Sequence, residues 1–426
     1  MNYSEIVIAE IQNGNLDDVE ENLQLALDSD DEDTLYLLGN TLYQLGFLNE
    51  TQRVYNYLLD LNPGDDELKI YLAEIEIENG NELEALDLLH SIEETSEAYT
   101  QSLMVQADYY HLNGLPEVSI QKLKEAEEIL PNEPIVKFAL AEVYFTTEDY
   151  QNAIQYYEQI VTTGEDEVAG TLLSVRLGNA YMMIGQYQEA IDYFNESLTY
   201  KDDPEVYYQL GLVYVQQEEY NQAYEPLNKA KTLDPSLSSV YILLADVYEQ
   251  QSKFEKALEE VEEGINHNEV NIEFYFKAAE LAAKLNDFEK AEIYYERAME
   301  IEPGNDRTII KYAEFQNYME DYEEVIELLG QSAETTRQLP EALWLMATAK
   351  NNMDEYDEAR ELFEQAAVYL EDDLDFLKEY AFFLREDGQR EKMREVAQKY
   401  VTMNPDVDAE MTSLLQEYDD FDDFSY

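Results

Sequence analysis

The sequence predicts an all-α fold, a solenoid of about 12 antiparallel helical hairpins, and three observations support this prediction. A skeleton of about 34 residues recurs along nearly the whole chain and is clearest between Pro204 and Pro235. One position of each full unit is always Gly or Ala, and most prolines fall at the ends of the expected helices. We therefore expect neighbouring hairpins to stack, although the 426 residues alone would suggest two or three separate domains.

Residues 204–235 form one unit with two amphipathic faces. The first helix places its core-facing side chains three or four positions apart, at Tyr207, Leu210, Gly211 and Tyr214. A turn at residues 218–220 leads to a second helix, whose inner face carries Ala223, Leu227 and Ala230. The unit is therefore expected to be a helical hairpin with small residues where the two helices approach most closely.

The register of the hairpins follows from the small position on each first helix. Full units begin near residues 32, 66, 100, 134, 171, 204, 238, 272, 306, 340 and 374. The small position reads Gly39, Ala73, Ala107, Ala141, Gly178, Gly211, Ala245, Ala279, Ala313, Ala347 and Ala381. A larger side chain would separate helices that pack about 8–10 Å apart, so the restriction has a steric cause.

Two features of the second helices are less regular. Their own small position departs from Ala at Thr51, Ser119, Val325 and Met393. Pro226 is expected well inside a second helix, where it indicates either a kink or a helix that begins later.

The unit length and the small positions resemble the tetratricopeptide repeat (TPR), and the resemblance covers nearly the whole chain. The resemblance implies a right-handed superhelical solenoid whose first helices line a concave, protein-binding groove. In overall style the chain also resembles the long, acidic, cytoplasmic TPR proteins of Gram-positive bacteria. This likeness does not name a partner.

The expected domain boundaries follow from the repeats. Residues 1–31 are expected to form an N-terminal repeat, 32–166 repeats 1–4, 167–405 repeats 5–11, and 406–418 a C-terminal capping helix. The acidic segment 419–426 is expected to be a disordered tail, with a linear binding motif as the alternative. The longest connection, residues 162–171, is expected to be an extended loop, with a hinge as the alternative.

Charge is the most extreme property of the composition. The chain has 96 acidic residues against 26 Lys and Arg, which gives a formal net charge of -70. This charge disfavours direct binding to nucleic acid and to anionic membranes, and it attracts cationic protein segments. The alternative is that the charge serves only solubility or reflects a salty cytoplasm.

The remaining composition favours a soluble protein of the cytoplasm. The chain has no Cys, which excludes disulfides and thiolate metal sites and is compatible with a reducing compartment. No segment approaches the roughly 18 consecutive apolar residues of a membrane span. The first fifteen residues lack the basic and apolar regions of a signal peptide, so we do not expect membrane insertion or export.

The predicted binding surface is the stripe of the first helices that the TPR resemblance assigns to the concave groove. Three groove positions recur in each unit, separated by four and then three residues. The partner-binding residues are expected to be Tyr36, Asn40, Tyr43, Ile70, Glu74, Ile77, Met104, Asp108, Phe138, Glu142, Phe145, Asn179 and Met182.

Apolar and acidic side chains alternate along this stripe. The pattern suits an extended or helical peptide that presents Lys or Arg between apolar anchors. The alternative is that the apolar members only pack between adjacent first helices. The stripe lacks the cationic positions with which some TPR domains clamp a C-terminal carboxylate, so an acidic chain terminus is not expected as the ligand.

No catalytic constellation is expected. The three histidines, His90, His111 and His267, fall in different units without a repeated partner. The acidic run at residues 28–33 lacks the turn glycine and terminal glutamate of a calcium loop, and no phosphate-binding glycine loop is present. We therefore expect no enzymatic activity, no catalytic residues, no cofactor and no metal.

The resulting functional hypothesis is a non-enzymatic scaffold or adaptor that binds basic or mixed basic-apolar protein segments in its groove. One alternative is a peptide-sensing TPR regulator whose superhelix changes shape on binding a short peptide. Another is a hydrolase built on helical hairpins, which would require carboxylates converging in one deep pocket. The sequence does not fix the client protein, the pathway or the oligomeric state.

Overall fold

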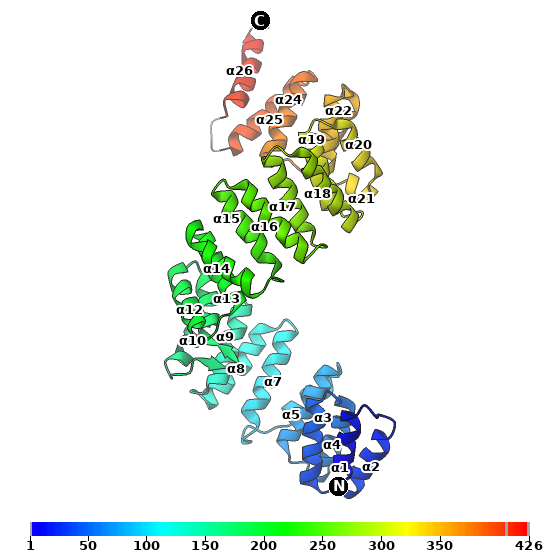
Figure 1. Cartoon of the computed structure of the whole chain (residues 1–426), viewed down its shortest axis with the longest axis vertical. Helices are drawn as coiled ribbons and strands as arrows, with labels where there is room; N and C mark the ends of the chain where they lie inside the picture. Colours follow the sequence, from blue (N-terminus) through cyan, green and yellow to red (C-terminus); the bar gives the residue numbers. More distant parts are fainter. Residues whose placement is uncertain (1, 405–407, 424–426) are drawn as a thin grey trace. The chain divides into compact units, whose positions relative to one another are not determined.

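The computed structural model describes residues 2–404 and 408–423, and it confirms the all-α solenoid of helical hairpins. In these residues, 26 helices follow one another along the chain (Figure 1). They divide into two compact units, Met1–Gln217 and Glu218–Tyr426. The division falls inside the unit of residues 204–235, between its first and second helix.

The first compact unit contains thirteen helices in its described residues, with first helices odd-numbered and second helices even-numbered. They are α1 (Tyr3–Gln12), α2 (Val19–Ser29), α3 (Glu32–Gln44), α4 (Leu48–Leu61), α5 (Asp66–Glu78), α6 (Glu82–His90), α7 (Tyr99–Leu112), α8 (Pro116–Ile129), α9 (Pro134–Thr146), α10 (Tyr150–Val161), α11 (Leu173–Met183), α12 (Tyr187–Tyr200) and α13 (Pro204–Gln216). Residues 1–31, expected to be a repeat of their own, contain the α1 and α2 pair.

The second compact unit begins with a second helix. Its described helices are α14 (Tyr220–Leu233), α15 (Ser238–Gln250), α16 (Phe254–His267), α17 (Ile272–Lys284), α18 (Phe288–Ile301), α19 (Asp306–Tyr318), α20 (Tyr322–Gln331), α21 (Glu334–Arg337), α22 (Pro340–Asn352), α23 (Tyr356–Ala366), α24 (Leu374–Glu386), α25 (Arg390–Met403) and α26 (Ala409–Asp423). Helix α14 runs through Pro226 from Tyr220, so this proline does not delay the helix start.

The small position of the first helices is buried in all eleven full units, as the steric argument predicts. The close approach is clear at two of the glycines of this position, Gly39 and Gly178. A methyl group added at Gly178 would lie 2.6 Å from Cδ1 of Phe194 on the facing helix α12, and Gly39 packs against Tyr55 in the same way. The register that the sequence predicts is therefore the register of the hairpin core.

Each full hairpin turns through a residue with left-handed backbone, and this residue is often not glycine. Gly46 and Gly185 have φ of 79° and 73°, whereas Glu148 and Glu320 have 63° and 60° at the equivalent place. The turn satisfies the last carbonyls of the first helix, as when the N–H of Asp149 donates to Tyr144 O at 2.9 Å. A side chain in this conformation costs about 1 kcal/mol, which glycine avoids.

The connection at 162–171 contains a feature that the sequence did not predict. Strands β1 (Glu167–Val168) and β2 (Thr171–Leu172) pair antiparallel across a turn at Ala169 and Gly170. Both turn residues have positive φ, 49° and 77°, which is typical of a tight hairpin turn. Val168 is buried in the same apolar cluster as α9 and α10, so the connection packs onto the core.

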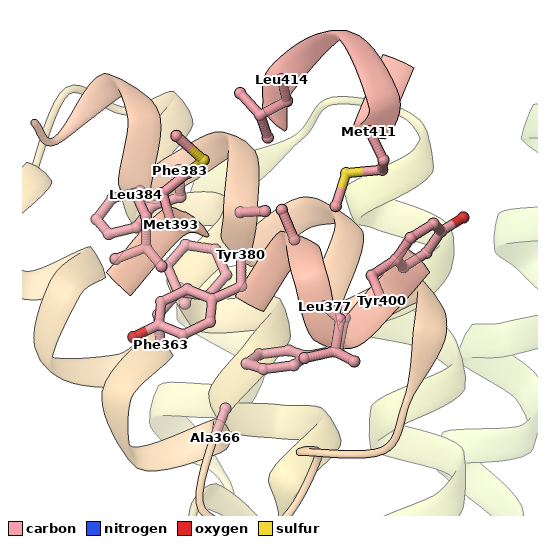
Figure 2. Packing of buried hydrophobic residues seen from close by; sticks show 14 of the residues in the cluster. Phe363, Ala366, Leu377, Tyr380, Phe383, Leu384, Met393, Tyr400, Met411 and Leu414 are labelled. Atoms are coloured by element: carbon pink, nitrogen blue, oxygen red, sulfur yellow. The ribbon is translucent and has the colours of Figure 1, made fainter. Parts of the chain in front are cut away.

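Helix α26 covers the end of the second unit. Met411 and Leu414 are buried in one cluster with residues of α24 and α25, and Figure 2 shows both directed towards these helices. Asp408 caps α26 by accepting hydrogen bonds from Glu410 N and Met411 N at 2.9 and 3.1 Å. The helix extends to Asp423, and so includes part of the segment 419–426 that we expected to be a disordered tail; residues 405–407 and 424–426 lie outside the described residues.

Candidate functional site

The thirteen predicted partner-binding residues all lie on first helices of the first compact unit, namely α3, α5, α7, α9 and α11. We call these residues the groove stripe. Ile70 is fully buried and Phe138 is only 9% exposed, so we assign these two side chains to the core rather than to the surface. Asn40 and Asp108 are exposed, and the other nine members are partly exposed.

Contacts between neighbouring first helices connect the stripe. The hydroxyl of Tyr43 on α3 donates to Glu74 Oε2 on α5 at 3.3 Å, and its ring lies 6.3 Å from that of Tyr71. Tyr36 donates to Asp65, directly before α5. These phenol groups connect α3 with the N-terminal cap and with the later part of α5, and both tyrosine side chains remain partly exposed.

Farther along the stripe, a basic residue enters the contacts. Arg176 on α11 pairs with Glu142 on α9 at 2.8 Å, and its guanidinium lies 6.0 Å from the centre of the Phe145 ring. The hydroxyl of Tyr157 also donates to Glu142. The carboxylate of Glu142 is therefore already neutralised within the protein.

Glu74 and Asp108 differ from Glu142 in this respect, because neither has a Lys or Arg nitrogen within 4 Å in the described part of the chain. Burial raises the pKa of Glu74, against the opposing effect of the Tyr43 hydrogen bond, and the charge of Asp108 raises it further. The side chain of Asp108 keeps an exposed edge, but the protein atoms around its carboxylate desolvate it and raise its pKa, while His111 opposes this shift. Two partly desolvated carboxylates thus lie on adjacent helices without a cation.

The amino-acid sequence explains why no cation is near. Arg53 and Lys69 are the only Lys or Arg among residues 1–121. Arg53 pairs with Glu20 at 2.5 Å, and Lys69 pairs with Asp66 at 2.6 Å. The stripe at α5 and α7 therefore lies in the part of the chain that is poorest in positive charge.

In the second compact unit, basic residues neutralise two of the three equivalent carboxylates, Asp246 and Glu280. The third, Glu314, has no Lys or Arg nitrogen within 4 Å in the described residues, and burial raises its pKa. Lys277 on α17 pairs with Asp246 and Glu249 on α15, both at 2.6 Å. Lys311 on α19 pairs with Glu280 on α17 at 3.2 Å. Sequence reasoning missed these cations, although they recur at the position of Arg176, one residue after the central groove position.

The described residues also bear on metal sites and membrane spans. No group of three or more His, Asp or Glu in residues 2–404 and 408–423 has an arrangement that could hold a metal ion. Within the same residues, every helix falls short of the length and apolar character needed to cross a membrane.

Comparison with protein families finds four matches along the chain. Residues 112–165 match a family described as YpiA-like, tetratricopeptide repeats, and residues 340–407 match YpiA-like, C-terminal tetratricopeptide repeats. Residues 272–305 match the tetratricopeptide repeat itself. Residues 183–264 match the anaphase-promoting complex, cyclosome, subunit 3.

Among curated proteins, the chain is similar to the TPR repeat-containing protein YpiA of Bacillus subtilis (strain 168). The two are 34% identical over 212 residues, which cover 49% of each, so the chain spans about half the length of this relative. Among solved structures, yeast Tom70 is 17% identical with a TM-score of 0.44, covering 91% of this chain and 96% of that one. The Cut9–Hcn1 hetero-tetramer is 10% identical with a TM-score of 0.41, covering 98% and 96%.

Proposed function

Because this chain is a tetratricopeptide repeat protein, we propose that it is a non-enzymatic scaffold that binds basic or mixed basic-apolar protein segments on its groove stripe. Repeat proteins of this kind act in protein–protein interaction, because stacked repeats present extended surfaces. The partner chemistry proposed for this chain comes from its own residues. The scaffold acts in the cytoplasm and binds neither nucleic acid nor membranes.

The observation that carries the proposal is the pair Glu74 and Asp108. Both carboxylates are partly desolvated, and neither is paired with a cation in the described residues. A bound cation would offset this desolvation, because an opposite charge favours the ionised carboxylate and charge-assisted hydrogen bonds are stronger than neutral ones. A Lys or Arg of a partner segment supplies that cation.

Partly exposed apolar side chains flank the two carboxylates. Ile77 lies on α5 with Glu74, Met104 lies on α7 with Asp108, and Phe145 lies on α9. Flexible Met side chains adapt to irregular apolar surfaces, and aromatic side chains bury large areas of a partner. The surface therefore favours a segment that places apolar side chains next to its Lys or Arg.

The net charge of -70 strengthens this preference at long range. A field of one sign raises the rate at which oppositely charged segments meet the protein, and this effect weakens as salt is added. Binding of a basic segment is therefore expected to weaken with ionic strength mainly through a lower association rate.

A titration with defined peptides tests the proposal. The probes are a peptide that alternates Lys with Leu, one with Glu in place of Lys, and one with Ser in place of Leu, each followed by fluorescence anisotropy. The Lys–Leu peptide is expected to bind best. The variant Glu74→Gln/Asp108→Asn is expected to weaken it about tenfold, because it removes two charge-assisted contacts at a partly exposed surface.

Control variants separate the stripe from general charge and hydrophobicity. Glu84→Gln/Glu117→Gln removes the same charge from exposed positions on the second helices α6 and α8. Met104→Ala/Phe145→Ala tests the apolar anchors, with exposed Leu83→Ala as the matched control. Equal affinity of the stripe and control variants for the Lys–Leu peptide would overturn the proposal.

A further inference from the structure

A pocket of the second compact unit carries two lysines that the groove stripe does not involve. It has a volume of about 310 Å³ and lies where α14, α15 and α16 meet. Six side chains line it, namely Asn221, Tyr224, Tyr248, Gln251, Lys253 and Lys256. Asn221 and Tyr224 belong to α14, Tyr248 to α15 and Lys256 to the first turn of α16.

The two ammonium groups lie around one aromatic ring. Nζ of Lys256 is 5.6 Å and Nζ of Lys253 is 5.9 Å from the centre of the Tyr248 ring. The ring of Tyr224 lies 5.8 Å from that of Tyr248 and forms a second wall. Lys253 Nζ also donates to Gln251 Oε1 at 2.5 Å. The pocket therefore combines two cations with neutral polar and aromatic walls.

Neither lysine has a carboxylate oxygen within 4 Å in the described residues. This is unexpected in a chain with 96 acidic residues and 26 Lys and Arg. Nearby lysines of the same unit show the usual situation, since Lys231 pairs with Glu260 and Glu263 at 2.7 and 3.0 Å.

The repeat itself shows which carboxylate is missing. Lys290 and Lys392 occupy the position of Lys256 in their own hairpins, and they pair with Glu262 and Glu364 of the preceding hairpin at 2.6 and 2.8 Å. The position equivalent to these two glutamates in the hairpin before Lys256 is Asn228. This part of the chain therefore has the lysine, Lys256, but a neutral side chain, Asn228, at the position where the other two pairs have the glutamate.

Lys253 is equally unusual for its position, directly before the second helix. The other full hairpins place no basic residue there, and they read Phe47, Asn81, Leu115, Asp149, Gln186, Glu219, Asp287, Asp321, Glu355 and Gln389. A cation at the start of a helix is unfavourable, because the helix dipole is positive there. The two lysines therefore reduce the stability of α16, and local rules of this kind are broken mainly at functional sites.

We propose that this pocket binds a small multivalent oxyanion, one that carries phosphate or carboxylate groups. Lys253 and Lys256 bind its oxygens and the side-chain amide of Asn221 donates a further hydrogen bond. The Gln251 amide holds Asn221 in place by donating to its Oδ1 at 3.4 Å, and the two tyrosine rings line the pocket. The volume suits a ligand of that size. The site is separate from the groove stripe, so it stands or fails independently of the proposed scaffold function.

Calorimetric titration of the full chain with pyrophosphate and with citrate, at constant ionic strength set with sodium chloride, tests the inference. At least one of the two is expected to bind saturably with one site, and the comparison tells phosphate from carboxylate ligands. The variant Lys253→Gln/Lys256→Gln is expected to weaken binding at least tenfold. The control Lys392→Gln/Lys399→Gln removes the same charge from α25 and is expected to leave binding unchanged.

A second variant leaves both lysines in place. Asn228→Glu supplies the carboxylate that the other hairpins have, so it is expected to pair with Lys256 and to weaken anion binding by a similar factor. Helical content by circular dichroism confirms that each variant is folded. Heat that does not saturate with either anion, or equal binding by wild type and Lys253→Gln/Lys256→Gln, would overturn the inference.

Discussion

The close contact between Gly178 and Phe194 predicts a specific coupling between these two positions. A Cβ atom at residue 178 would lie 2.6 Å from two atoms of the Phe194 ring, and both residues are buried. Gly178→Ala is therefore expected to force the ring to move, which costs about 1–3 kcal/mol. Alanine regains about 1 kcal/mol because it favours the helix over glycine, so the net loss is about 1 kcal/mol.

A compensating substitution tests the cause. Ala107 and Leu123 occupy the equivalent positions of another hairpin, and both are fully buried in one cluster. Phe194→Leu alone is expected to cost about 1 kcal/mol through the cavity that it leaves. In Gly178→Ala/Phe194→Leu the new methyl group occupies part of that cavity, so the double variant should be more stable than the two single losses together predict.

Local hydrogen exchange is the suitable assay, because stacked repeats need not unfold as one cooperative unit. Exchange of amides in residues 173–200 is followed by mass spectrometry for wild type, both single variants and the double variant. We expect a favourable coupling free energy of about 1–2 kcal/mol. Additive effects of the two substitutions, or exchange changes of equal size in α3 and α4, would refute the packing argument.

Three further predictions concern the turns, pH and salt. Glu148→Gly is expected to stabilise its hairpin by about 1 kcal/mol because it relieves left-handed backbone. Gln121→Gly, at an exposed position within α8, should destabilise by a similar amount, as measured by the same exchange assay. Burial raises the pKa of Glu74, so its contribution to stability is complete below its ordinary value of 4.5 and is lost as pH rises through the raised pKa. Tm by calorimetry should therefore increase as the pH is lowered from 7 towards 4.5. The pKa of Asp408 is instead lowered to about 2, chiefly by the hydrogen bond from Lys378. The contribution of Asp408 to stability is therefore lost as pH falls below its ordinary value of about 3.8. A Tm that decreases steadily from pH 7 would contradict this reasoning. Added sodium chloride should raise Tm, since it screens repulsion among the carboxylates, and a flat or falling Tm would count against that repulsion.

The sequence was sufficient to predict the fold, because the steric requirement at the helix crossing restricts one position of every full unit to Gly or Ala. Gly39 and Ala381 lie near opposite ends of the series, and both are buried as expected. The left-handed turns are less clear in the sequence, because both glycine and other residues occupy the turn position. Glu148 has the same left-handed backbone conformation as Gly46 at the equivalent place, so a search for glycine misses the turn at that hairpin.

The binding surface was harder to predict, since its electrostatics depend on contacts between repeats. Asp108 and Glu142 occupy the same position of adjacent units and look equivalent in the sequence. Only the structure distinguishes them, because Arg176 reaches Glu142 from the next first helix. Burial likewise separates Ile70, which belongs to the core, from the partly exposed Met104, although both occupy the central groove position.

The tyrosine contacts between repeats have an electrical consequence. The phenol of Tyr43 donates to Glu74, and burial and the nearby carboxylates raise its pKa to about 12, so the group remains an uncharged donor in neutral solution. An uncharged donor joins two helices without subtracting from the anionic total, whereas an ammonium group in the same place would cancel one carboxylate. Hydrogen bonds from phenols therefore connect adjacent repeats without reducing the negative charge of the surface.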